Sequence, residues 1–184
     1  MKILNRLLKT IILFILLIDL VFKVAGQCTP TVAGPQPGLN LGIKRVTLKT
    51  INRVSATEEG YVDATAMKAT IGRGQYTNLT IQTGITGQTT GVYVDFNHNG
   101  TFDFSSSEEV FFQEVNDTII SVPITIPLNA PKGYVRLRVF SWDGSFTSPC
   151  FAFCGFQIAD CLHPLRYGDI EDYTINITDT VVTA

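Results

Sequence analysis

The chain has 184 residues, of which 45% are hydrophobic and 16% are charged, and its formal net charge is −2 at pH 7. After removal of the leader described next, this length corresponds to one ordinary domain. The acidic balance argues against nucleic acid and anionic membrane surfaces as partners.

The first 26 residues have the pattern of a signal peptide. Three basic residues open the segment: Lys2, Arg6 and Lys9. The apolar run Ile11–Phe22 follows, and Val24–Gly26 supplies small residues for cleavage. The run is too short to span a bilayer, so we predict cleavage after residue 26, a single mature domain at 27–184 and an extracellular or cell-surface location. An uncleaved anchor is the alternative. The segment carries four basic residues and one acid, so its loss takes the net charge from −2 to −5.

All four cysteines fall in the mature domain: Cys28, Cys150, Cys154 and Cys161. An even number in an exported chain predicts two disulfides, for which three pairings are possible. We favour Cys28–Cys161 with Cys150–Cys154. A zinc site that includes His163 is the alternative, which an oxidising compartment disfavours.

Apolar residues recur with period two along the mature domain, in segments rich in Thr, Val, Ile, Tyr and Phe. About eight strands are predicted: Ile43–Ile51, Tyr61–Ala66, Tyr76–Thr83, Gly91–Phe96, Val110–Val115, Ile119–Ile126, Tyr134–Trp142 and Tyr173–Ile177. Short strands at this spacing predict an all-β, two-sheet antiparallel β-sandwich of jelly-roll or immunoglobulin-like type. Pro123 predicts that its strand is an edge strand or carries a bulge.

The segment 95–103, Asp-Phe-Asn-His-Asn-Gly-Thr-Phe-Asp, places side-chain oxygens at every second position around an Asn-Gly turn. This arrangement is typical of a loop that wraps Ca²⁺, a cation that takes six to eight oxygen ligands. The candidate ligands are Asp95, Asn97, Asn99, Thr101, Asp103 and Glu108.

The same loop departs from an EF-hand. Position twelve is Ser106 instead of a bidentate Glu, and the flanking segments are predicted strands. A plain Asn-Gly hairpin without metal is therefore an open alternative. Two neutral Asn ligands place any calcium affinity near the extracellular range of roughly 0.1–1 mM.

A second acidic cluster lies near the C-terminus, and we interpret it as a turn that leads into the last strand. Its motif residues are Gly168, Asp169, Glu171, Asp172 and Tyr173. One hypothesis makes it a solvated turn that caps the sandwich. The other brings Glu171 or Asp172 to the calcium loop, or to the backbone of a neighbouring loop.

These two segments resemble those of the GEVED domain, a module of secreted proteins of Bacteroidetes-type bacteria. The family motif Gly-Glu-Val-Glu-Asp-Tyr stands here at 168–173 as Gly-Asp-Ile-Glu-Asp-Tyr. The family segment Asp-(Phe/Tyr)-Asn-x-(Asp/Asn)-Gly-x-Phe-Asp stands at 95–103, and Glu108 matches the Glu that follows it.

Three further elements extend the resemblance. The family opening Cys-Thr-Pro stands at 28–30, the element Tyr-x-Asp at 61–63, and a Pro-x-x-Ala-x-x-Gly turn at 127–133 precedes Arg136 and Arg138. The resemblance implies a β-sandwich accessory module without known catalysis, and it strengthens the expectation of metal in the 95–103 loop.

The sequence favours a binding module over an enzyme. Neither Gly-x-Ser-x-Gly nor His-Glu-x-x-His occurs, and the acids in each adjacent pair point to opposite faces of a strand. We expect a secreted, non-catalytic, calcium-stabilised module in extracellular binding or adhesion, with a protein or glycan partner. An accessory domain of a secreted hydrolase and a purely structural domain are alternatives. Another is a carbohydrate-binding module that uses the aromatic loop 141–166, with Trp142, Tyr134 or Phe146 as stacking platform.

Overall fold

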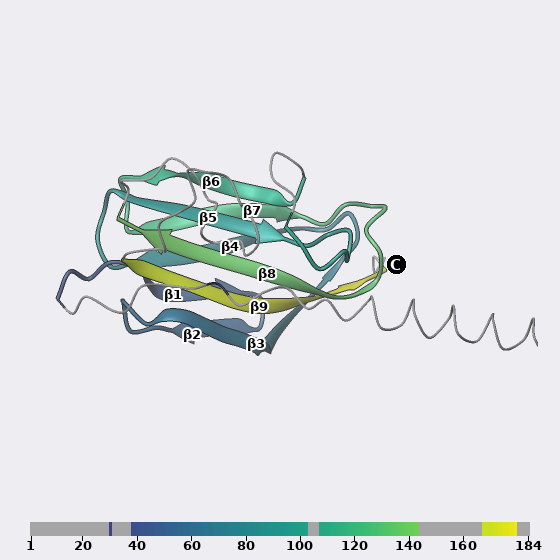
Figure 1. Ribbon diagram of the computed structural model, residues 1–184. Helices are drawn as coiled ribbons and strands as arrows, with labels where there is room; N and C mark the ends of the chain where they lie inside the picture. Colours follow the sequence, from purple (N-terminus) through teal and green to yellow (C-terminus); the bar gives the residue numbers. More distant parts are fainter. Residues whose placement is uncertain (1–29, 31–37, 103–106, 144–166, 180–184) are drawn as a thin grey trace, which may run out of the picture.

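A computed structural model describes residues 30, 38–102, 107–143 and 167–179 of the chain, and every structural statement below concerns these residues (Figure 1). The strands within these ranges, in chain order, are β1 (Ile43–Leu48), β2 (Ile51–Val54), β3 (Gly60–Gly72), β4 (Tyr76–Thr83), β5 (Gln88–Val94), β6 (Glu109–Val115), β7 (Ile119–Thr125), β8 (Gly133–Trp142) and β9 (Gly168–Thr178). The predicted leader, the four cysteines, Asp103 and Phe146 lie outside the described residues.

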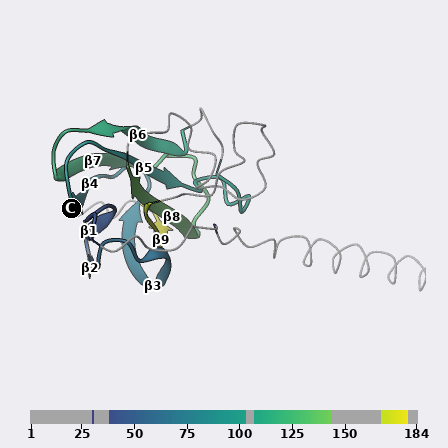
Figure 2. The same ribbon diagram turned by 60° about the vertical axis from the view of Figure 1, so that its left-hand side comes forward.

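The strands form two stacked sheets, which Figure 2 shows nearly end-on. One sheet has four strands in the order β2-β1-β4-β7, and the other has five in the order β3-β9-β8-β5-β6. The prediction of an all-β sandwich is therefore confirmed. Within the described ranges, no helix is long and apolar enough to cross a membrane.

Strand pairing is antiparallel in both sheets except between β3 and β9, which run parallel. The acidic strand β9 thus lies between a parallel neighbour and the antiparallel strand β8. Pro123 lies in β7, an edge strand of the four-stranded sheet, as predicted. Its missing N–H costs no ladder hydrogen bond at such an edge.

Alternation along the strands builds the main core between the sheets. In β7, for example, Ile120, Val122 and Ile124 are buried while the residues between them are exposed. In β9, Tyr173, Ile175 and Ile177 face the same core. Burying each large aliphatic side chain contributes roughly 1.5–3 kcal/mol, so this core is the main source of stability.

A second apolar cluster lies on the other side of the five-stranded sheet, and its buried members are Tyr93, Phe102, Phe140, Trp142 and Ile170. The rings of Phe140 and Trp142 stack with their centroids 4.6 Å apart. Gly91 makes room for this stack, because a Cβ at that position would lie 2.0 Å from Cζ of Phe140. Trp142 is fully buried here, so it offers no exposed stacking platform, whereas Tyr134 is 64% exposed.

Several predicted elements were wrong in their bounds, among them the strand expected at Tyr61–Ala66, which continues as β3 to Gly72. The single strand expected at Ile43–Ile51 is a hairpin of β1 and β2, because the chain turns at Lys49 with a φ of 54°. Lys49 and Thr50 carry no Gly or Asn signal of such a turn. The acidic motif expected to be a turn is part of β9, which begins at Gly168. It can be a buried strand because each of its carboxylates has partners inside the fold.

Candidate functional site

Asp172, on the outer side of the five-stranded sheet, is fully buried and forms ion pairs with two arginines. It stands directly opposite Arg138 of β8, whose Nε and Nη2 each donate to the carboxylate at 2.7 Å. Arg136 Nη1 donates at 2.8 Å and the Tyr61 hydroxyl at 2.9 Å. Both oxygens of Asp172 are therefore engaged by the protein itself.

Arg138 also connects Asp172 to the 95–103 loop. Its guanidinium carbon lies 5.2 Å from the ring centre of Phe102, which belongs to the loop, and 5.9 Å from that of Tyr61. A guanidinium at this distance over an aromatic ring is attracted to the ring face. The motif thus reaches the loop through Arg138, while the contacts of Asp172 itself are with arginines and a tyrosine.

Glu171 faces the other way, into the space between the sheets, and it too is fully buried. It accepts hydrogen bonds from Ser55 Oγ at 2.5 Å, from Arg53 of β2 and from the Tyr173 hydroxyl. Burial raises the pKa of Glu171 and also that of Tyr173, whose phenol therefore keeps its proton to donate. Because Arg53 belongs to the four-stranded sheet, Glu171 ties the two sheets together.

Asp169 is the third motif carboxylate, and it accepts hydrogen bonds from backbone N–H groups instead of from side chains. Its oxygens accept from the N–H groups of Ile43 at 2.8 Å, Gly60 at 2.9 Å and Glu58 at 3.1 Å. These donors belong to the start of β1 and to the connection before β3. The hypothesis that a motif acid binds a neighbouring loop therefore describes Asp169, and not Glu171 or Asp172 as we expected.

Glycines beside Asp169 leave it the space it needs. A Cβ on Gly42 would lie 2.0 Å from Oδ2 of Asp169, and one on Gly168 would lie 2.2 Å from the Ser141 carbonyl oxygen. Gly168 also has a φ of 130°, which L side chains rarely adopt. Gly168, the first residue of the motif, must therefore be glycine because β9 approaches β8 closely at this point.

A titration of Asp169 tests the burial of this site. Burial raises the pKa of Asp169 to about 6, against the N–H bonds, which lower it. The folded protein therefore takes up a proton near pH 6, where the unfolded chain stays ionised down to about pH 4. This group alone makes stability increase as pH falls from about 6 to about 4. We expect a carboxyl-carbon NMR midpoint near 6 for Asp169, and a midpoint below about 4 would contradict this prediction.

The described part of the 95–103 loop is closed by its own side chains. The carboxylate of Asp95 accepts from Asn99 N and Gly100 N, each at 3.1 Å. Asn97 Oδ1 accepts from Asn99 N at 2.8 Å, and Asn99 Oδ1 accepts from Thr101 N at 2.8 Å. The predicted ligand oxygens thus lie along one tight turn, where Gly100 has a φ of 81°.

Glu108 joins the loop from the start of the next strand. Its Oε1 accepts from Asn97 N at 3.1 Å, and both Glu108 and Asp95 are buried. Burial raises the pKa of Asp95. A cavity of about 180 Å³ beside them is lined by Phe96, Asn97, Ser107, Glu108, Pro127, Asn129, Ala130 and Pro131. The structure therefore brings Asp95, Asn97, Asn99, Thr101 and Glu108 into one loop region, with Asp103 outside the described residues.

Within the described ranges, no group of three or more His, Cys, Asp or Glu side chains could hold a metal ion. A cation at this loop would therefore depend on the two carboxylates together with amide and carbonyl oxygens. Such a mixed oxygen set suits Ca²⁺, since that ion takes carboxylate, amide and backbone oxygens in flexible geometry.

Sequence reasoning missed Arg53 and Ser55, the partners of Glu171. Arg53 also pairs with Glu59 at 2.7 Å, so one guanidinium serves two acids. No local pattern marks these residues, because they lie more than a hundred positions from Glu171. Arg136 and Arg138 did carry a signal, since they alternate on one strand face and that face meets Asp172.

Comparison with known proteins gives one positive finding. Residues 89–176, from β5 to β9, match the family model of the GEVED domain. This range contains the 95–103 loop and all three motif carboxylates. A search of curated proteins found no match. The strands β1 to β4 complete both sheets around the matched part, and the resemblance to the GEVED domain family is confirmed over residues 89–176.

Proposed function

We propose that this protein is a secreted, non-catalytic β-sandwich module that serves extracellular binding or adhesion and is stabilised by Ca²⁺ at the 95–103 loop. One observation carries the proposal: all three motif carboxylates are buried, and each is hydrogen-bonded to the protein's own groups. The family motif therefore acts as a structural core of the module, and its partners would bind elsewhere.

The motif geometry supports a non-catalytic role. Asp169 and Glu171 lie toward the interior between the sheets, and Asp172 lies on the opposite side of β9. A general acid and base must reach the same substrate bond, and neither side of β9 offers two carboxylates open to solvent. The arginines opposite Asp172 are used in the same internal contacts.

Calcium at the loop is the second part of the proposal. Its ligands would be oxygens of Asp95, Asn97, Asn99, Thr101, Asp103 and Glu108. The bound ion would hold the loop against the start of β6. Its role would be structural, as in extracellular modules with affinities of roughly 0.1–1 mM.

A thermal melt with EGTA and then with excess Ca²⁺ tests this part. At about ten times Kd, calcium adds roughly 1.4 kcal/mol, which should raise Tm by about 3–6 °C. Asp95→Asn keeps one acceptor oxygen for the loop N–H groups but removes the charge, and it should abolish the shift. Asp117→Asn, in the exposed turn between β6 and β7, is the matched control and should keep the shift. An equal Tm with EGTA and with calcium would remove metal from the account.

Of the candidate stacking residues for the carbohydrate-binding alternative that lie in the described ranges, Tyr134 is the exposed one. Tyr134 is exposed, and Lys68 Nζ lies 4.5 Å from its ring centre. An exposed ring can stack on a sugar. If Tyr134→Ala abolished binding to a neutral glycan in a polysaccharide panel, this alternative would replace the adhesion proposal.

A further inference from the structure

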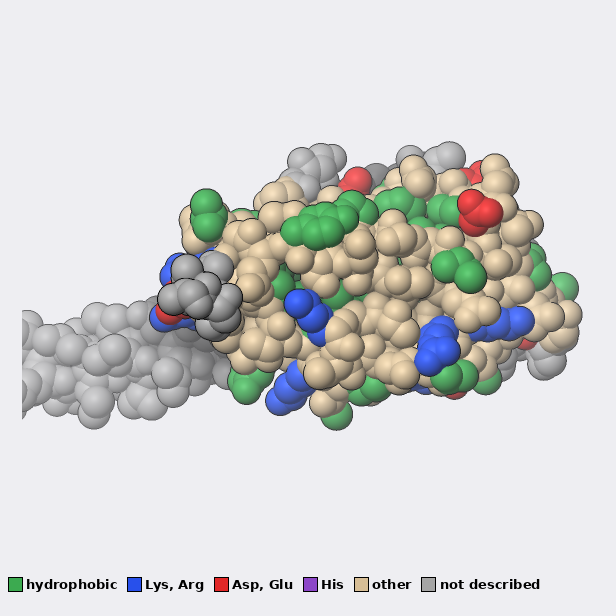
Figure 3. Space-filling view, turned by 180° about the vertical axis from the view of Figure 1, so that it is seen from behind, with side chains coloured by type: hydrophobic (Ala, Val, Ile, Leu, Met, Phe, Trp, Pro, Cys, Tyr) green, Lys and Arg blue, Asp and Glu red, His purple; other side chains and the backbone are tan. Residues whose placement is uncertain are grey.

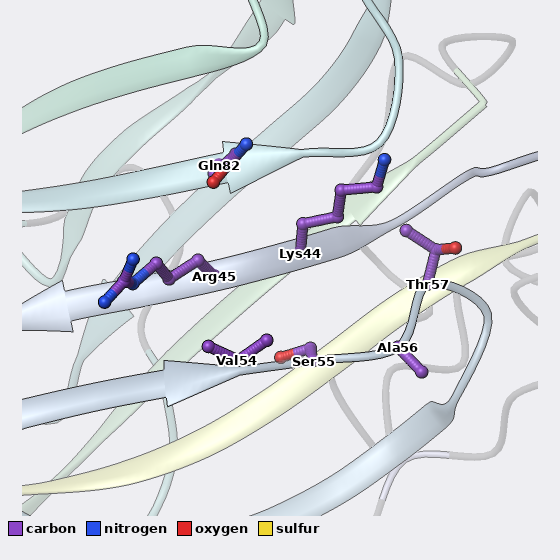
Figure 4. A pocket seen from close by; sticks show the side chains of 7 residues that line it. All are labelled: Lys44, Arg45, Val54, Ser55, Ala56, Thr57 and Gln82. Carbon is purple, nitrogen blue, oxygen red and sulfur yellow. The ribbon is translucent and has the colours of Figure 1, made fainter.

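A groove of about 400 Å³ opens where β1, β4 and the end of β2 meet, in the four-stranded sheet (Figure 4). Lys44 and Arg45 of β1 rise from its floor, Gln82 lies on one side, and Ser55 and Thr57 lie on the other. None of the residues that line the groove belongs to the motif or to the 95–103 loop. It combines two cations with hydroxyl and amide groups.

A β-bulge places both cations in this groove. Ile43 pairs with Thr83 and Arg45 with Gln82, so Lys44 is an extra residue in β1. In a regular strand, consecutive residues point to opposite faces. The bulge breaks this alternation, which is how strands re-aim a side chain beside a site. In Figure 4 the Lys44 and Arg45 side chains extend in different directions along β1, so the groove offers two separate positive ends.

These cations are not used to stabilise the fold. Among the described residues, Arg53, Arg73, Lys132, Arg136 and Arg138 form salt bridges, and Lys44 and Arg45 do not. Arg45 Nε donates to Asn52 Oδ1 at 2.9 Å, which orients the guanidinium without neutralising it. The charge of both groups therefore remains available to a ligand.

The wall of the groove is held in place by the motif. Ser55 Oγ donates to buried Glu171 at 2.5 Å, and Ser55 N donates to the Lys44 carbonyl oxygen at 2.9 Å. The two acids in the adjoining connection are also engaged, since Glu59 pairs with Arg53 and Glu58 accepts from Leu39 N. A ligand would therefore find the groove already formed. The acids next to the groove are engaged elsewhere and do not compete for Lys44 and Arg45.

The sheet surface beyond the groove suits a sugar chain. Asn52, Thr47, Thr80 and Ser121 stand in register across the four strands and form a row of hydroxyl and amide groups. Figure 3 shows this face: basic side chains are spread over its lower half, and the larger acidic areas lie toward its upper rim, with small ones at the edges. The net negative charge of the domain therefore does not extend over the lower half of this face.

We propose that this groove and the adjoining row bind an acidic polysaccharide, whose sulfate or carboxylate groups pair with Lys44 and Arg45. The proposal rests on the extracellular binding function given above and names its ligand class. A single exposed ion pair contributes little, so a free monovalent anion would bind weakly. A polymer can occupy both cations at once and extend along the polar row, which multiplies the effect through effective concentration.

Binding to dextran sulfate, with uncharged dextran as the matched polymer, tests the proposal on the mature protein. We expect dextran sulfate to bind, dextran to bind at least tenfold more weakly, and binding to weaken as NaCl rises from about 50 to about 300 mM. Polygalacturonate, which carries carboxylates, distinguishes the two anionic groups. Equal binding of dextran and dextran sulfate would overturn the proposal while leaving a neutral-glycan or protein partner for the module.

Variants locate the site. Lys44→Gln with Arg45→Gln should weaken dextran sulfate binding about tenfold. The double variant Lys49→Gln with Lys132→Gln removes the same charge from exposed positions outside the groove and should weaken it less than threefold. Unchanged melting curves of both proteins show that they are folded. An equal loss in the two double variants would overturn the groove as the site, because only net charge would then matter.

Discussion

Asp172→Asn is expected to lower the free energy of unfolding by about 3–5 kcal/mol. Asn has nearly the same shape, but it leaves the guanidinium of Arg138 buried without its counter-charge. Removing one partner of a buried ion pair is costly because the remaining charge has lost both water and its partner. Small domains have a free energy of unfolding of only about 5–15 kcal/mol, so this substitution should leave the folded state marginally stable.

Denaturant unfolding of the protein measures this effect, and Asp179→Asn is its control. Asp179 also contacts two basic residues, Arg73 and Lys132, but its side chain is 58% exposed. An exposed pair contributes little because water screens both charges, so the control should change little. Similar small losses in the two variants would mean that Asp172 is not a structural partner of Arg138.

Asp169→Ala is expected to cost about 3 kcal/mol or more. The substitution removes the acceptor of three backbone N–H groups, those of Ile43, Glu58 and Gly60. Each buried donor that loses its partner costs about 1–3 kcal/mol. Asp169→Asn keeps one oxygen for the bonds of Ile43 and Glu58, so its loss should be about half as large.

The measurement is again the denaturant midpoint, with Asp63→Ala as control. Asp63 also accepts a backbone N–H, that of Thr65, but on the exposed side of β3. Its loss should be about 1 kcal/mol or less, because water can replace the acceptor. If Asp169→Ala were as mild as Asp63→Ala, the start of β1 and the connection before β3 would not depend on the motif.

Sequence patterns predicted the fold through short-range signals. Alternating apolar residues marked most strands, and the buried and exposed residues of β7 follow that pattern. Pro123 predicted an edge strand because its missing N–H excludes it from a sheet centre. The loop oxygens of Asp95, Asn97 and Asn99 were also recognisable, since the whole turn is contiguous in sequence.

Long-range pairing could not be predicted in the same way. The motif was interpreted as a turn because three acids in five residues normally lie in water. Their burial depends on Arg53, which is 118 positions from Glu171, and on the Arg136 and Arg138 face meeting Asp172 across the β8–β9 ladder. The bulge at Lys44 is likewise a property of register between β1 and β4, and a single strand sequence does not reveal it.

On the proposals above, different residues carry stability and ligand recognition. Motif carboxylates hold β9 to both its own sheet and the opposite one, and Glu171 also positions the Ser55 wall of the basic groove. Substitutions in the motif should therefore act on binding only through folding. Substitutions of Lys44 and Arg45 should act on binding alone, since neither forms a salt bridge within the described residues.

A double-mutant cycle between Asp172 and Arg138 tests the central claim, that the family motif is a structural core. The free energies of unfolding of the wild type, Asp172→Asn, Arg138→Met and the double variant would be measured by denaturant titration. We predict a coupling of about 2–3 kcal/mol, with the double variant less damaged than the sum of the single ones. A coupling below about 0.5 kcal/mol would contradict the claim and return the motif to the search for a ligand or a reaction.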